Sequence, residues 1–231
     1  MIALVFPFLG ELQGFVDGLT GVSELKAGGL RTFSLQDEPE WLLAVGGQGK
    51  VETALTCQML HSAFALNRFL LLGSAGALDP ALMPGDIVVG ERCLEWDFLS
   101  KGEKGPNPPP SFRPSQSFPP VVNGPAYRVG TILSADRDLF DPEEKSRLFR
   151  ESGAALTAWE GAGFHRFLKR SGAVGWEIRV VVEAAGEARL SRQEFMGRME
   201  RFFPPLRPLA QAVELAGRSA GPTASGPGDR G

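Results

Sequence analysis

The chain has 231 residues, of which 43% are hydrophobic, and a formal net charge of −3 with a pI near 5.6. This length supports one sizeable hydrophobic core, so we expect a single domain over residues 1–216 and a flexible tail rich in Gly, Pro and Ser over 217–231. The charge argues against a dedicated nucleic-acid-binding protein, because such proteins carry a basic face.

The apolar run 2–8 is too short to span a bilayer, so we interpret it as a buried strand and expect no membrane partner. Two cysteines, Cys57 and Cys93, form neither a disulfide framework nor a metal-binding spacing. His61 has no second histidine or cysteine placed to join it, and we interpret it as a packing residue. These observations predict a protein of the reducing cytoplasm with no metal or other cofactor.

Strands and helices alternate along the chain. Buried-strand patterns cover residues 2–8, 41–45, 69–72, 88–98, 127–133, 154–157 and 176–182, and a hairpin is expected over 23–36. Helical patterns fill most of the segments between them. We therefore expect an α/β fold with three α-β-α layers around a central mixed, largely parallel sheet.

The expected helices carry recognisable packing and capping patterns. The helix after the first strand should turn Leu12, Phe15 and Val16 inward. Capping signals at 141–144 and 191–194 open two later helices. The helix that begins near residue 50 has one face that we expect to pack on the sheet, formed by Val51, Ala54, Leu55, Gln58, Met59 and Ser62.

Two segments rich in glycine or proline are interpreted as loops. The run 46–50 suggests a phosphate-binding P-loop, but that motif needs glycine where Ala44 stands and Ser or Thr where Val51 stands. The segment 100–125 is rich in proline, which predicts a long loop. Long loops in α/β proteins often form a lid over a site or a subunit contact.

The run Gly73-Ser74-Ala75-Gly76 interrupts an apolar strand. Residues this small let a ligand approach the backbone closely, and Ser74 offers a hydroxyl. A turn at Asp79-Pro80 and a new strand from Asp86 follow. The local pattern fits a binding loop and a plain connection between two strands equally well.

Three carboxylates, Glu11, Glu160 and Glu183, each stand just beyond an expected strand. Ligands of open α/β sheets bind at the carboxyl ends of the strands, so we expect these side chains and Ser74 to meet. For Glu11 alone, a favourable position at a helix N-terminus is the simpler interpretation.

Several of these motifs resemble one family. The run 73–89 is similar to the ribose-side loop of the nucleoside phosphorylase superfamily, in particular its 5′-methylthioadenosine/S-adenosylhomocysteine nucleosidase branch. The resemblance implies that Glu11 activates water. It places Glu160, in Ala-Trp-Glu-Gly-Ala, at the glutamate that grips the ribose hydroxyls. It places Glu183, in Arg-Val-Val-Val-Glu, at the family's general acid in Arg-x-x-Ser-Asp.

The match to the family is incomplete on the side of the purine base. Glu183 replaces an aspartate, Val182 a serine and Ala158 a glutamate, while Asp138 stands where the family has an aromatic residue that stacks on the purine. Phe140 or Trp159 could stack there instead. The substrate-binding residues that the resemblance implies are Ser74, Ala75, Gly76, Leu139, Phe140, Trp159 and Glu160.

The resemblance implies a hydrolase that cleaves a purine nucleoside, similar to 5′-methylthioadenosine, S-adenosylhomocysteine or futalosine, to the free base and a ribose derivative. It needs no cofactor and is expected to be a homodimer, with Trp96, Phe98 and the segment 100–125 as a contact. One alternative is a phosphorolytic enzyme, although no arginine precedes Arg31 and Arg68 is expected at the far edge of the sheet.

Another alternative is a nucleoside-binding member of the fold that has lost catalysis. In that case Glu183 should pair with Arg179 or Arg189 and turn away from the site.

Overall fold

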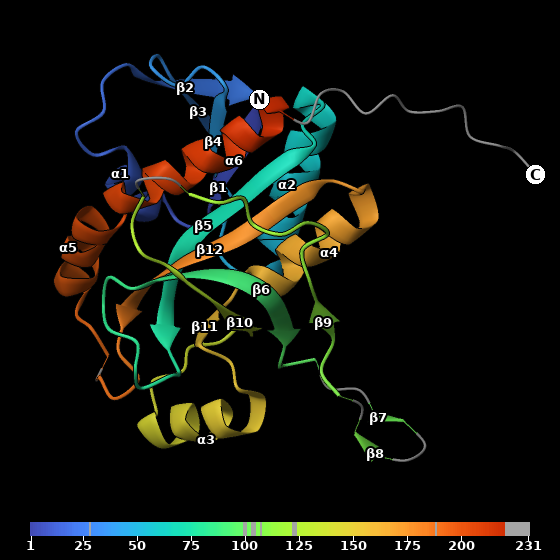
Figure 1. Ribbon diagram of the computed structural model, residues 1–231, viewed down its shortest axis with the longest axis vertical. Coiled ribbons are helices and arrows are strands. Elements are labelled where there is room, and N and C mark those ends of the chain that lie inside the picture. Colours follow the sequence, from blue (N-terminus) through green and yellow to red (C-terminus); the bar gives the residue numbers. More distant parts are fainter. Residues whose placement is uncertain are drawn as a thin grey trace, which may run out of the picture.

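The computed structural model describes residues 1–27, 29–98, 101–102, 105–106, 108–121, 124–187 and 189–219 (Figure 1). Its strands are β1 (Ile2–Phe6), β2 (Val22–Ala27), β3 (Leu30–Leu35), β4 (Trp41–Val45), β5 (Arg68–Ala77), β6 (Ile87–Glu95), β7 (Lys101–Gly102), β8 (Gly105–Pro106), β9 (Ser111–Phe112), β10 (Arg128–Ser134), β11 (Leu156–Ala158) and β12 (Val174–Glu183). Its helices are α1 (Leu9–Val16), α2 (Lys50–Phe64), α3 (Pro142–Ser152), α4 (Gly161–Ser171), α5 (Arg192–Phe202), the 3-10 helix η1 (Pro204–Leu206) and α6 (Arg207–Ser219).

The main sheet is mixed and partly closed. Its strand order is β11-β10-β6-β12-β5-β1-β4-β3-β2, and β11 also pairs with β5. Strands β5, β12, β6, β10 and β11 therefore form a ring. The pairs β1–β4, β1–β5, β5–β12, β6–β10 and β10–β11 are parallel, whereas β5–β11, β6–β12, β2–β3, β3–β4 and β6–β9 are antiparallel. The predicted α/β fold with a mixed sheet is confirmed. The expectation of a largely parallel sheet was wrong, because as many of these strand pairs are antiparallel as parallel, and the closed ring was not predicted.

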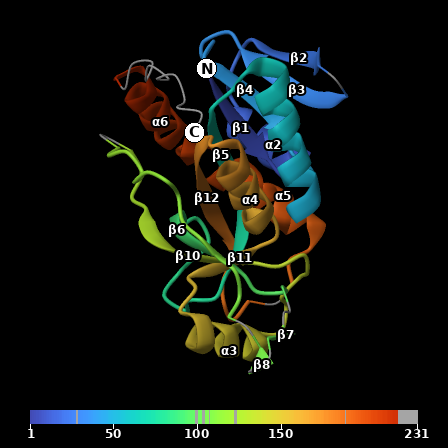
Figure 2. The ribbon, with the colours of Figure 1, turned by 90° about the vertical axis from the view of Figure 1, so that its right-hand side faces the viewer.

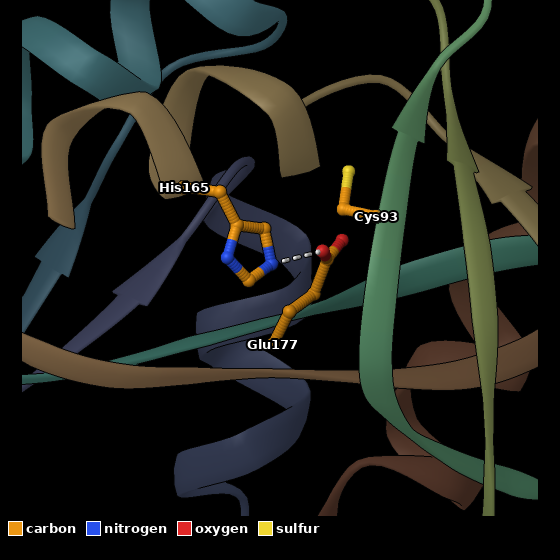
Figure 3. A group of neighbouring side chains, drawn as sticks. All are labelled: Cys93, His165 and Glu177. Atoms are coloured by element: carbon orange, nitrogen blue, oxygen red, sulfur yellow. Dashed lines mark ion pairs between the residues drawn. The ribbon is translucent and has the colours of Figure 1, made fainter. Parts of the chain in front are cut away.

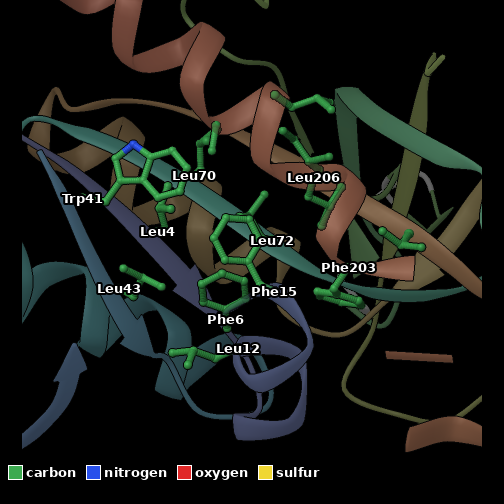
Figure 4. Packing of buried hydrophobic residues seen from close by; sticks show 14 of the residues in the cluster. Leu4, Phe6, Leu12, Phe15, Trp41, Leu43, Leu70, Leu72, Phe203 and Leu206 are labelled. Atoms are coloured by element: carbon green, nitrogen blue, oxygen red, sulfur yellow. The ribbon is translucent and has the colours of Figure 1, made fainter. Parts of the chain in front are cut away.

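Helices cover both faces of the sheet around β1, as the view in Figure 2 shows. Successive residues of a strand point to opposite faces. Leu4 and Phe6 join a hydrophobic cluster with α1, η1 and α6, which Figure 4 shows at close range. Ala3 and Val5 join a second cluster with α2 and α4. The alternation in β1 therefore fixes the sheet between two helical layers.

The buried face of α2 differs from the prediction. Val51, Leu55 and Met59 are 66%, 54% and 42% exposed. The buried side carries Thr53, Thr56, Cys57 and Leu60. The threonine hydroxyls donate to backbone carbonyls at 3.2 and 3.0 Å, so small polar residues can be buried there. The predicted apolar face was wrong because α2 turns Cys57 and Leu60, on another side of the helix, into the cluster that it shares with α4.

The run Gly73–Gly76 is part of β5 and not a loop. Ser74 pairs with Val180 of β12, and Gly76 pairs with Thr157 of β11. A Cβ atom added to Gly73 would lie 2.2 Å from Nη1 of Arg179. Gly73 is therefore required by the close approach of Arg179, whereas the sequence alone suggested a turn here.

The proline-rich segment lies away from the pocket described below. β9 pairs with β6, and Phe118 packs against Tyr127 and Trp176. Its residues 108–121 do not line that pocket, so over these residues the alternative of a lid was wrong, and the alternative of a subunit contact stays a prediction. Helix α6 continues to Ser219, and the rest of the expected tail lies outside the described residues. None of the described helices has the length and hydropathy needed to cross a membrane.

Candidate active site

One pocket of about 420 Å³ brings the expected site residues together. Its walls come from the start of α1, the end of β5, the segment after β10, the junction of β11 with α4, the end of β12 and the start of α5. The lining includes every residue expected in the site: Glu11, Ser74, Ala75, Gly76, Leu139, Phe140, Trp159, Glu160 and Glu183.

Glu11 occupies the first turn of α1 and is only 2% exposed. One carboxylate oxygen accepts hydrogen bonds from the backbone nitrogen and the hydroxyl of Ser74, both at 2.7 Å. The other accepts from the nitrogen of Phe8 at 3.1 Å. Burial raises the pKa of Glu11 to about 7 and the charge of Glu160 adds to this, although the Ser74 hydrogen bonds and Arg179 oppose it. Glu11 can therefore exchange a proton near neutral pH.

Glu160 sits at the N-terminus of α4 and is 5% exposed. One oxygen accepts a hydrogen bond from the nitrogen of Gly49 at 3.2 Å, and the other pairs with Nη1 of Arg179 at 3.0 Å. The glycine-rich run that suggested a P-loop thus donates to a carboxylate. Its Gly49 adopts φ +88, a conformation that favours glycine.

Arg179 lies beneath the pocket with a side chain that is not exposed. Its Nε donates to Glu177 at 2.8 Å, and its Nη1 also lies 3.5 Å from the carbonyl oxygen of Ser74. Burial alone would lower the pKa of the guanidinium, but the charges of Glu177, Glu160 and Glu11 raise it. Arg179 therefore remains a cation shared among buried carboxylates.

Glu183 ends β12, next to a register shift in the pairing with β5. Its carboxylate pairs with the ammonium group of Lys145 on α3, whose side chain is fully buried. The expectation for a merely structural Glu183 was an ion pair with Arg179 or Arg189 outside the site. The carboxylate is instead paired with Lys145 and lines the pocket.

The segment after β10 forms the wall where the resemblance places the purine base. Arg137, Asp138, Leu139 and Phe140 all line the pocket there. The guanidinium of Arg189 lies 4.7 Å from the centre of the Phe140 ring, within the range of a cation–π contact. An aromatic ring is therefore present near the position that Asp138 occupies in the motif.

The sequence did not identify several groups in or beside the pocket. Lys145 was missed because its partner lies 38 residues away along the chain. The pocket residues that were not anticipated as site residues are Pro7, Phe8, Gln48, Arg137, Thr157, Arg189, Leu190, Arg192 and Phe195. Most of them carry no motif, so the sequence offered no signal for them.

Comparison with known proteins places the chain in a family. A family model described as the phosphorylase superfamily matches residues 2–202. The 5′-methylthioadenosine/S-adenosylhomocysteine nucleosidase of Mycobacterium bovis is 28% identical over 178 residues, covering 63% of this chain and 70% of that protein. The enzyme of the same name from Staphylococcus haemolyticus is 25% identical over 211 residues, covering 85% of this chain and 92% of that protein.

Solved structures show the same fold. Futalosine hydrolase of Helicobacter pylori matches with a TM-score of 0.74 and 19% identity, covering 93% of this chain and 97% of that chain. The 5′-methylthioadenosine/S-adenosylhomocysteine nucleosidase of Campylobacter jejuni matches with a TM-score of 0.71 and 17% identity, covering 91% and 98%. The resemblance drawn from the motifs is confirmed, and the chain belongs to the phosphorylase superfamily.

Proposed function

We propose that this protein is a hydrolytic nucleosidase that cleaves the N-glycosidic bond of a purine nucleoside. The observation that carries the proposal is the position of Glu11. Its carboxylate, with a pKa of about 7, shares one pocket with Glu160 and Glu183. Hydrolysis of such a bond needs a base for water, contacts to the sugar and a proton for the departing purine.

Each carboxylate receives one role in this proposal. Glu11 accepts a proton from water as the water oxygen bonds to C1′ of the sugar and the C1′–N bond breaks. Glu160 accepts hydrogen bonds from the ribose hydroxyls. The departing purine takes up a proton through Glu183, which is paired with Lys145 and stands at the place of the family's general acid. The two carboxyl groups that handle protons, Glu11 and Glu183, thus have different surroundings, as acid and base roles require.

Water is favoured over phosphate as the nucleophile. Arg179 lies beside Glu11, and Glu177 and Glu160 already neutralise its charge. Of the arginines that line the pocket, Arg137 is paired with Glu144 and Arg189 lies over the ring of Phe140. Arg68 lies away from the pocket, with Nη1 3.5 Å from the carbonyl oxygen of Val213. Binding phosphate beside Glu11 and Glu160 would bring another anion to buried carboxylates, which is unfavourable.

The names of the relatives and the altered residues on the side of the purine base support a substrate class. The curated relatives are named for 5′-methylthioadenosine and S-adenosylhomocysteine, and one structural neighbour is named for futalosine. We propose a 5′-substituted purine nucleoside of one of these kinds. Phe140, held by Arg189, is the aromatic ring that we propose stacks on the base.

A nucleoside-binding protein without catalysis is the second candidate. The observation that favours it is the ion pair between Glu183 and Lys145, because a paired carboxylate is a weaker proton donor. The two candidates differ in whether the bound nucleoside is cleaved.

We also propose that the protein is a homodimer. Helix α2 exposes Val51, Leu55 and Met59 along one face, and an exposed apolar stripe of this kind is typical of a protein–protein contact. A second copy of the chain is the partner that the family relationship suggests.

One experiment tests the proposed function. Purified protein is incubated with 5′-methylthioadenosine, S-adenosylhomocysteine, inosine and futalosine, each with and without phosphate, and free base is measured by chromatography. We expect base release from at least one nucleoside without phosphate. Release only with phosphate would support the phosphorolytic alternative, and binding without release from any of them would support the second candidate.

A further inference from the structure

A row of four ionisable side chains runs from the core to the floor of the pocket. Nε2 of His165 lies 3.3 Å from Oε2 of Glu177, and Oε1 of Glu177 accepts a hydrogen bond from Nε of Arg179 at 2.8 Å. Nη1 of Arg179 then lies 3.0 Å from Glu160. Figure 3 shows the inner end of this row, where His165 of α4 faces Glu177 of β12 beside Cys93 of β6. We call these four side chains the buried row.

The buried row is placed by secondary structure. Glu177 and Arg179 are two residues apart in β12, so both point to the same side of the strand. Glu160 is the N-cap residue of α4, and His165 lies in the second turn of the same helix. Strand β12 therefore supplies the two middle groups of the row, and α4 supplies the two outer ones.

All four groups are at least 95% buried, with exposures of 3% for His165, 0% for Glu177 and Arg179, and 5% for Glu160. Buried charges are stable only when they are paired and hydrogen-bonded. Arg179 is paired on both sides, and Glu177 is the partner on the side away from the pocket. Burial would raise the pKa of Glu177, but Arg179 and His165 hold it below its usual value.

We propose that Glu177 and His165 are positioning residues that hold the guanidinium of Arg179 against Glu160. This inference rests on the proposed function, which gives Glu160 the ribose hydroxyls. Neither Glu177 nor His165 lines the pocket, so both act through Arg179. Losing Glu177 would remove the group that holds Nε of Arg179, and the guanidinium would turn toward Glu11 and away from its present contact with Glu160.

The space around Arg179 makes its position sensitive to such a change. A Cβ atom on Gly73 would lie 2.2 Å from Nη1, so the guanidinium fills the gap over this glycine. The same Nη1 lies between Glu160 and the carbonyl oxygen of Ser74. Arg179 therefore contacts Glu160, the proposed ribose-binding residue. It also contacts Ser74 of β5, the residue that is hydrogen-bonded to Glu11, the proposed general base.

A metal site is the other interpretation of the inner end of the row. One ligand atom each from Cys93, His165 and Glu177 lie within 4.8 Å of one another, and all three residues are buried. However, Arg179 lies 2.8 Å from Glu177 and opposes a cation there. Burial, with the charge of Glu177, also raises the pKa of the Cys93 thiol well above its usual value, which favours the protonated form. These observations favour the ion-paired row.

The test compares Glu177→Gln with a matched control, Cys93→Ala, which removes a neighbouring side chain but no member of the row. Crystal structures of both variants and of the wild type are determined, and kcat and KM are measured with the best nucleoside. In Glu177→Gln we expect Arg179 to leave its 3.0 Å contact with Glu160. We expect kcat to fall roughly 10- to 100-fold, the loss typical of a displaced catalytic group. Cys93→Ala should retain both the contact and kcat.

Each outcome decides the proposal. An Arg179–Glu160 contact that survives in Glu177→Gln overturns it, whether or not the wild type cleaves nucleosides. Absence of activity in the wild type contradicts the proposed function alone, because the crystallographic comparison still decides the positioning role. Stoichiometric zinc in the wild type, measured by mass spectrometry and lost in Cys93→Ala, would establish the metal site and overturn the row.

A milder variant covers the case in which Glu177→Gln does not fold. His165→Gln keeps the pair between Glu177 and Arg179 and removes only the imidazole that faces Oε2 of Glu177. We expect a smaller displacement of Arg179 and a fall in kcat of several fold, with KM changed less than kcat. An unchanged Arg179 position together with an unchanged kcat would contradict the proposal.

Discussion

Glu11 and Ser74 are joined twice, because one carboxylate oxygen accepts hydrogen bonds at 2.7 Å from both the backbone nitrogen and the hydroxyl of the serine. This contact fixes the first helix to the end of β5. It also holds a buried carboxyl group, with a pKa of about 7, at the floor of the pocket. The proposed base is therefore placed by the fold and tuned by burial.

The rate of cleavage should follow the ionisation of Glu11. A base must be deprotonated, so kcat/KM should rise with pH and level off above about 7, the pKa of the free enzyme's Glu11. The measurement is kcat/KM against pH from 4.5 to 9. An acidic limb centred near the ordinary glutamate value of 4.5 would show that Glu11 is not the titrating base.

The same pKa shift predicts a cost in stability. The pKa of Glu11 is about 7 in the folded state and near 4.5 when unfolded, so its contribution to stability is fully present below pH 4.5 and is lost as pH rises through 7. Glu11→Gln cannot ionise, so its stability relative to the wild type should increase by roughly 2 to 3 kcal/mol between pH 5 and pH 8. Urea unfolding of both proteins at the two pH values measures this difference. A difference that does not depend on pH would contradict the assigned pKa.

Glu183→Asp should lower activity, although it restores the acid found in the family motif. The shorter side chain withdraws the carboxylate from Lys145, and a shift of about an ångström can cost on the order of a hundredfold. We expect kcat/KM to fall at least tenfold, and Lys145→Met to cause a similar loss. Higher activity in Glu183→Asp would mean that Lys145 does not position the acid.

Gly73→Ala should displace Arg179. The new Cβ would lie 2.2 Å from Nη1 of Arg179, and overpacking of this kind typically costs about 1 to 3 kcal/mol. We expect a lower melting temperature and reduced kcat. Gly76→Ala is the control for stability, because its Cβ would meet Thr157 at an ordinary 3.8 Å. Equal melting temperatures for the two variants would contradict the close packing of Arg179 on Gly73.

A charge placed on the exposed apolar face of α2 should disrupt the proposed dimer. Leu55→Asp puts a charge in the centre of that face, and we expect it to convert a dimer to a monomer in light scattering. Met83→Asp, at a site that is 61% exposed but lies in a loop, should leave the dimer intact. A wild-type monomer, or a dimer unaffected by Leu55→Asp, would contradict the proposed contact.

The sequence predicted the parts of the site that depend on strand ends and ordered motifs. Glu11 and Glu160 follow strands of the sheet and Glu183 is the last residue of one, so the topology gathers them in one pocket. The alternation of strand and helix patterns along the chain predicted the α/β fold, because such patterns are local in the sequence.

Other features depend on contacts between distant segments. Gly73 looked like part of a turn, but it is small because Arg179 lies over it. The apolar stripe with Leu55 looked like a core face, but the buried side of α2 carries Cys57 and Leu60, together with two threonines whose hydroxyls are hydrogen-bonded. Lys145 gave no signal, because a lysine on an otherwise polar helix is usually exposed. Ring closure also depends on the long-range β5–β11 pair.

The most direct test of the central claim follows the oxygen of water into the product. The wild type is incubated with its best nucleoside in ¹⁸O-labelled water, with phosphate present, and the sugar product is analysed by mass spectrometry. If Glu11 activates water, the free sugar should carry one ¹⁸O at its anomeric position, and Glu11→Gln should form no product. A sugar 1-phosphate without the label, or labelled product formed equally fast by Glu11→Gln, would contradict the claim.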